Sequence, residues 1–172
     1  RMSSDGEITE QGLRPQRYDE QTNIPLRDPR RQSIAFEDGR IVLPGNRVRP
    51  TVAGVQDSAS QFVQLTWLFT TQPQKLRPGE WIEVPLALPR HVDLWRYEVV
   101  GEEALATPAG TIPTFYVRPR RETRPGGDLL VEAWFAPSLQ YLPVRIRIRQ
   151  DAETSIDLLL NSLPKQEQAP AR

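Results

Sequence analysis

Three arginines on one expected strand are the side chains best suited to hold a ligand: Arg145, Arg147 and Arg149. Residues 144–149 alternate strictly between aliphatic and arginine side chains, so the arginines share one face of the strand. A guanidinium group fits phosphate and carboxylate well, and we expect an anion-binding face here. The alternative is a solvated face on which the arginines pair with nearby acids such as Glu132 and Asp157. The balance of 22 basic and 22 acidic residues favours that alternative.

Large aromatic side chains are the candidates for an apolar binding site. A sheet that curls around apolar side chains is either filled by them or leaves a cavity for a ligand. A filled core is the more common outcome, whereas a cavity would take an acyl chain or another amphiphile. The candidate residues are Phe62, Trp67, Phe69, Trp95, Phe115 and Trp134.

Catalytic and metal chemistry has little support in the sequence. His91 is the only histidine and there is no cysteine, so a standard zinc site would need several carboxylates. Glu102 and Glu103 are adjacent in an expected strand and point to opposite faces. No nucleophile elbow, phosphate loop or dinucleotide motif occurs. We therefore expect no enzyme activity, no catalytic residue, no metal and no cofactor; a hydrolase would require His91 to be buried beside a carboxylate and a Ser or Thr.

The elements that position these side chains are nearly all strands. Turns with Gly or Pro separate them, which is typical of an antiparallel meander, and such a sheet must close or curl because open edges promote aggregation. We expect an all-β fold: one curled antiparallel sheet, a barrel or half-barrel, with one amphipathic helix inserted mid-chain. The expected strands cover residues 2–9, 14–20, 33–36, 40–43, 80–86, 94–102, 111–118, 129–135, 144–149 and 155–160.

One helix is expected over residues 58–71. Its apolar side chains recur at helical spacing, and Pro73 cannot continue it. Ser58 followed by Gln61 three residues later forms a capping box, and Asp57 adds negative charge at the positive end of the helix dipole. We expect this helix to pack inside the sheet or across its mouth.

The length, composition and net charge of the chain limit how it can be organised. A length of 172 residues fits a single β-barrel-like domain over residues 1–163, followed by a disordered polar tail over 164–172. No apolar run is long enough to span a membrane, and zero net charge argues against a nucleic-acid partner. The sequence begins with Arg1 rather than Met, so we expect a piece of a longer protein that lacks upstream strands and any signal or anchor.

Four stretches, in this order, resemble one protein family. They are residues 4–15 (SDGEITEQGLRP), residues 56–62 (QDSASQF), residues 100–103 (VGEE) with Gly110, and residues 134–137 (WFAP) with residues 141–145 (YLPVR). The last is the most specific. Together they are similar to the bacterial domain-of-unknown-function family DUF3108, over about residues 3 to 160.

The resemblance implies an exported or periplasmic protein of the Gram-negative envelope, often behind an N-terminal anchor, with no established activity. It also implies a curled sheet with a helix in its concavity, similar to lipoprotein carriers and to the sensors that regulate sigma factors. We therefore expect a non-enzymatic cell-envelope protein that binds a lipid-like or amphiphilic ligand in the concavity of the sheet. The alternative is a structural or interaction module that contacts an envelope protein partner through a sheet edge.

Overall fold

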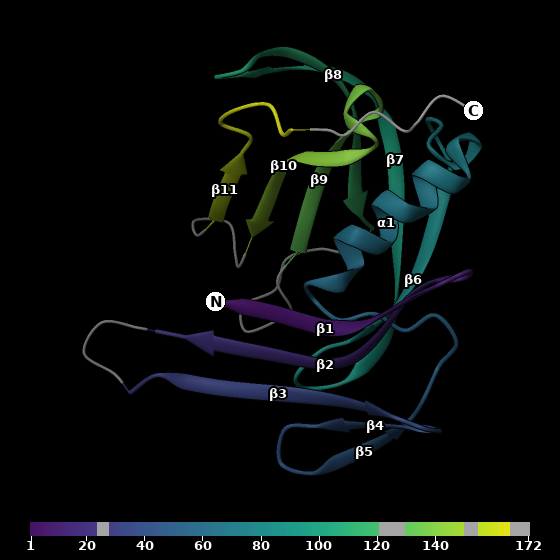
Figure 1. The fold of residues 1–172 in the computed structure, drawn as a ribbon, viewed down its shortest axis with the longest axis vertical. Coiled ribbons are helices and arrows are strands. Elements are labelled where there is room, and N and C mark those ends of the chain that lie inside the picture. Colours follow the sequence, from purple (N-terminus) through teal and green to yellow (C-terminus); the bar gives the residue numbers. More distant parts are fainter. Residues whose placement is uncertain (24–27, 121–129, 150–154, 166–172) are drawn as a thin grey trace. The chain divides into compact units, whose positions relative to one another are not determined.

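The computed structural model describes residues 1–23, 28–120, 130–149 and 155–165, and it is mostly β with two antiparallel sheets and one helix (Figure 1). The first sheet is a meander of five strands in chain order. Each strand pairs with the next through a short connection, so the expected antiparallel meander is confirmed here. Its strands are β1 (Met2–Thr9), β2 (Gly12–Thr22), β3 (Arg30–Glu37), β4 (Arg40–Leu43) and β5 (Arg47–Pro50).

The second sheet has six strands in the order β11-β10-β9-β8-β7-β6, again a meander. Two short 3-10 turns lie beside it in sequence, at Pro73–Lys75 and Pro137–Leu139. The strands are β6 (Trp81–Ala87), β7 (Val92–Thr107), β8 (Gly110–Pro119), β9 (Leu130–Ala136), β10 (Leu142–Arg149) and β11 (Ser155–Leu159).

The expectation of one continuous sheet is wrong, because the described residues form two sheets. Neither sheet is closed or strongly curled among the described residues, so closure into a barrel stays a prediction. The Cα positions divide the chain into two compact units, each built from two segments. Unit 1 is Arg1–Leu68 with Glu83–Arg96, and unit 2 is Phe69–Ile82 with Tyr97–Arg172. The single domain over residues 1–163 likewise stays a prediction.

The expected helix is present as α1 (Ser60–Thr71) and ends before Pro73, as the sequence predicted. Its cap differs from the expected one. The Asp57 carboxylate accepts the backbone N–H groups of Ala59 and Ser60 at 2.8 and 2.9 Å, and the Ser60 hydroxyl accepts the Asp57 N–H at 2.9 Å. The reciprocal capping box therefore joins Asp57 to Ser60, while the Gln61 side chain donates to the backbone carbonyl of Ser58 at 3.0 Å.

Unit 1 has its own apolar core beneath the five-stranded sheet. Side chains from strands β2, β3 and β4 supply most of it, and Ile41 and Leu43 lie at alternate positions of β4. The buried residues are Tyr18, Ile34, Ile41, Leu43, Val55 and Ala87. Strand β5, in this unit, is not among the strands expected from the sequence.

In unit 2, a smaller cluster forms where β7 to β10 lie next to one another in the sheet. Its members are Leu105, Ile112, Trp134, Ala136 and Val144. No helix among the described residues has the length and apolar character needed to cross a membrane.

Candidate functional site

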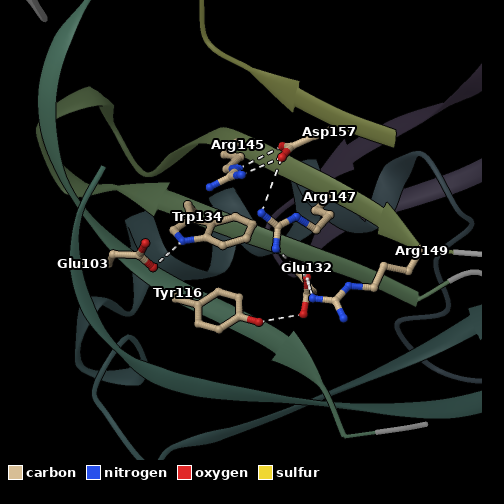
Figure 2. A network of polar contacts seen from close by, with 8 residues as sticks. All are labelled: Glu103, Tyr116, Glu132, Trp134, Arg145, Arg147, Arg149 and Asp157. Carbon is tan, nitrogen blue, oxygen red and sulfur yellow. Dashed lines mark hydrogen bonds and ion pairs between the residues drawn. The ribbon is translucent and has the colours of Figure 1, made fainter. Parts of the chain in front are cut away.

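The arginine face of β10 is matched by two carboxylates (Figure 2). Arg145 donates two hydrogen bonds to Asp157 on β11, at 2.8 and 2.5 Å. Arg149 donates to Glu132 on β9 at 3.1 Å. Arg147 lies between the two acids, 3.5 Å from Asp157 and 3.8 Å from Glu132. The alternative of a face paired with acids is thus confirmed, and anion binding at these arginines stays a prediction.

Trp134 lies at the centre of this network and is 3% exposed. Its ring stacks on Tyr116 from β8, with centroids 4.6 Å apart and planes 17° from parallel. The guanidinium groups of Arg145 and Arg147 from β10 lie 4.8 and 5.4 Å from its centroid. Its indole N–H donates to Glu103 at 2.7 Å. Since β8 and β10 flank β9, the ring is contacted from both neighbouring strands, which locks it in place.

The carboxylates of the network have separate tasks. Glu132 is buried and accepts hydrogen bonds from Arg149 and from the Tyr116 hydroxyl, the latter at 2.7 Å. The hydrogen bond from Arg145 holds the pKa of Asp157 below its usual range, with Arg147 adding to the effect. A lowered pKa means that this ion pair stabilises the fold at neutral pH and that its contribution fades as the pH falls through the pKa of Asp157 in the folded protein.

Tyr116 is expected to ionise at a higher pH than an ordinary tyrosine. Burial, and then the hydrogen bond to Glu132, raise its pKa to about 12. The folded state therefore favours the neutral phenol, and this contribution to stability is present below pH about 10 and is lost as the pH rises towards about 12. Burial also raises the pKa of Tyr18, so a spectrophotometric tyrosinate titration should show late-titrating groups from both tyrosines, of which one disappears in Tyr116→Phe. In Glu132→Gln the titration of Tyr116 should shift to lower pH; if it does not move, the link to Glu132 is wrong.

The candidate aromatic residues do not gather on one face. Phe115 pairs with Phe135, whereas Tyr116 pairs with Trp134, so Trp134 faces the opposite side of the sheet from Phe115. Phe69 contacts Phe135 edge-to-face at 5.0 Å and is buried. The remaining candidates lie in unit 1, where Trp95 is buried and Phe62 and Trp67 are half-buried. Ligand binding by these six residues stays a prediction, and the grouping that it assumed is corrected for Trp134.

The other face of β9 to β11 is apolar and becomes exposed at its outer end. The register places Ile146 beside Leu158 and Ile148 beside Ile156. The two β10 side chains are half-buried, whereas Ile156 is 57% and Leu158 is 53% exposed. Strand β11 is the last strand of the sheet, and all five of its residues are exposed. Its one charged residue, Asp157, is held on the opposite face by Arg145 and Arg147.

In unit 1, two motifs that carry the family resemblance hold the β1–β2 hairpin against the start of the helix. The backbone of Leu13 donates to the Gln64 side chain at 2.7 Å and accepts from Gln56 at 2.9 Å. Ser4 donates to the buried Asp57 at 2.6 Å, across 53 residues. The Gln56 backbone also bonds to β6, accepting from Ala87 and donating to Pro85, both at 2.8 Å. These motif residues therefore have a structural task, and neither the Ser4 contact nor the Gln64 contact was foreseen from the sequence.

Gly12 has no substitute in this hairpin, and Gly12→Ala is expected to lower the free energy of unfolding by about 2 kcal/mol or more. Its φ is 111°, and an added Cβ would lie 2.5 Å from the Gln64 side-chain oxygen, which already accepts a hydrogen bond. Gly110 has a φ of 110° but open space around it, so Gly110→Ala measures the backbone strain alone. Urea denaturation of both variants isolates the collision, and equal losses would contradict it.

The chain matches the family model described as "Protein of unknown function (DUF3108)" over residues 1–158. No curated protein and no solved structure matches the chain. The resemblance found in the hairpin, helix and WFAP motifs is thereby confirmed.

Proposed function

Because the chain belongs to the DUF3108 family of proteins of unknown function, we propose a function from its own surface. The protein is a non-enzymatic cell-envelope protein that binds a protein partner through the β11 edge of the six-stranded sheet. The observation that carries this proposal is the exposed apolar edge strand. An edge strand offers unpaired backbone groups, and side chains at alternate positions supply specificity when an extended segment is added.

The charge distribution on β11 supports the same proposal of strand pairing. Soluble proteins usually protect an edge strand with charged side chains that point outward. The one charge on β11, Asp157, is neutralised by a forked hydrogen bond from Arg145, so it offers little protection. Ile156 and Leu158 then leave an apolar strip at the margin of the sheet. Such a strip next to free backbone groups is typical of a surface that pairs with another strand.

A photo-crosslinking amino acid at position 158, introduced into the protein in its native cells, tests this proposal. A specific crosslinked band of defined mass is expected at Leu158. The same label at Ile8, which is 81% exposed on β1 in the other sheet, serves as the control for random encounter. No band at position 158, or the same bands from both positions, would contradict contact through β11.

The cell-envelope location rests on the family resemblance and needs its own measurement. Fractionation of the native cells should place the protein with periplasmic or envelope markers. Recovery with cytosolic markers alone would contradict the location and leave the crosslinking result to be judged by itself.

An amphiphilic ligand is the second candidate function. The apolar sheet face that carries Phe115 and Phe135, with Phe69 against it, favours this candidate. Closure or curling of the sheet around that face would form the concavity that an acyl chain needs. Native mass spectrometry of protein purified from its own envelope, followed by lipid extraction, should then show a bound species of defined mass. A bare polypeptide mass would count against the ligand.

A further inference from the structure

Strand β11 is self-complementary, and we propose that its partner is a second copy of this chain, paired antiparallel about a two-fold axis at Asp157. This inference rests on the proposed function and names the partner. In an antiparallel pair, residues opposite each other share a face of the sheet. With Asp157 on the axis, Ile156 lies opposite Leu158 of the second copy, and the same contact repeats on the other side. The exposed apolar strip of each copy is then covered by that of the other.

The register follows from the two faces of β11 together with its length, since a shift by two residues would keep the faces but leave fewer of its five residues paired. A shift by one residue would place Asp157 beside an apolar side chain of the second copy and mix the polar and apolar faces. In the part of the chain that the structure describes, no strand pairs with the outer edge of β11. The backbone groups on that edge are therefore available for the added ladder.

The arginines supply the charge complementarity that the axis requires. Two facing carboxylates repel each other, which would disfavour a strand centred on an acid. Here each copy brings Arg145 and Arg147 to the same point, so four guanidinium groups surround two Asp157 carboxylates. Arg147 is 3.5 Å from Asp157 and is shared with Glu132, so it is placed to bridge to the second carboxylate. A guanidinium group with five donors can serve two carboxylates at once.

The expected dimer is weak and reversible. A strand of five residues buries less surface than the roughly 1,200 Å² of the smallest standard interfaces. Sedimentation of the whole chain should therefore show a monomer that converts to dimer as its concentration rises. Leu158→Lys should weaken the dimer at least about tenfold, because it places a charge in the apolar strip. Ile8→Lys, an equally drastic change at an exposed residue of the other sheet, should leave the dimer unchanged.

The absence of cysteine allows the register to be tested directly. Only a residue on the two-fold axis lies opposite itself, so Asp157→Cys should form an intermolecular disulfide under mild oxidation. Ser155→Cys, two residues away on the same face, would lie opposite Leu159 and should not. Circular dichroism confirms that each variant is folded before its result is counted.

Separate outcomes judge the two proposals. A monomer at every concentration, or a dimer that Leu158→Lys leaves intact, overturns pairing between copies. If the crosslink from position 158 then carries the mass of another protein, the proposed function stands with a different partner. If position 158 gives no crosslink, both proposals fail. A crosslinked mass of two chains, together with the intermolecular disulfide of the Asp157→Cys variant, supports both.

Discussion

Replacing Trp134 with alanine is expected to lower the free energy of unfolding by about 3–5 kcal/mol, the usual loss for a buried tryptophan. The ring is almost fully buried, stacks on Tyr116 and lies against two guanidinium groups. Its removal leaves a cavity in the sheet and leaves Glu103 without the indole donor. Urea denaturation followed by circular dichroism measures the change.

A milder variant separates packing from hydrogen bonding. Trp134→Phe keeps an aromatic ring beside Tyr116 and removes only the N–H and part of the volume, so a smaller loss is expected than for alanine. If Trp134→Ala cost less than about 1 kcal/mol, well below the usual range, the ring would not be the centre of this network.

Replacing Asp57 with alanine is expected to cost about 2–4 kcal/mol, from the lost helix cap and from the half-buried Ser4 hydroxyl left without its acceptor. One Asp57 carboxylate oxygen receives two backbone N–H groups of the helix start, and the other receives the Ser4 hydroxyl. The change therefore weakens both the helix and its hold on β1. The midpoint and slope of urea denaturation report the loss.

Asp57→Asn is the matched control. The Asn side-chain oxygen caps a helix about as well as that of Asp, so most of the stability should return. Ser4→Ala should reproduce only the part of the stability loss that comes from the contact with β1. If Asp57→Asn were as damaging as Asp57→Ala, the carboxylate charge and not the cap would be the source of the stability.

Alternation along strands made much of the fold predictable. The pattern at Arg145, Arg147 and Arg149 gave the face of each side chain, and the nearby acids were foreseen as Glu132 and Asp157, which the ion pairs confirm. Alternation shows on which face of a strand each side chain lies, but it does not show which strand lies next to it. It therefore left open where one sheet ends and the next begins, and the break into two sheets was missed.

The errors in the site have local causes. Asp57–Ser60 and Ser58–Gln61 are overlapping capping patterns one residue apart, and only the geometry decides between them. Trp134 was grouped with Phe115 by residue type, although its neighbour Phe135 is the one that pairs with Phe115. Contacts such as that between Ser4 and Asp57 join residues 53 apart, and a single sequence carries no signal for them.

The division into discontinuous units has a consequence for biosynthesis. During translation, the first segment of unit 1 leaves the ribosome well before the second, Glu83–Arg96, and Phe69–Ile82 of unit 2 emerges between them. Unit 1 is therefore incomplete until Arg96 has been synthesised, and its first segment must wait for the second. No single proteolytic cut in the chain releases either unit whole and free of the other, because the segments of the two units alternate along the chain. A gene fragment for unit 1 alone would have to join Leu68 directly to Glu83.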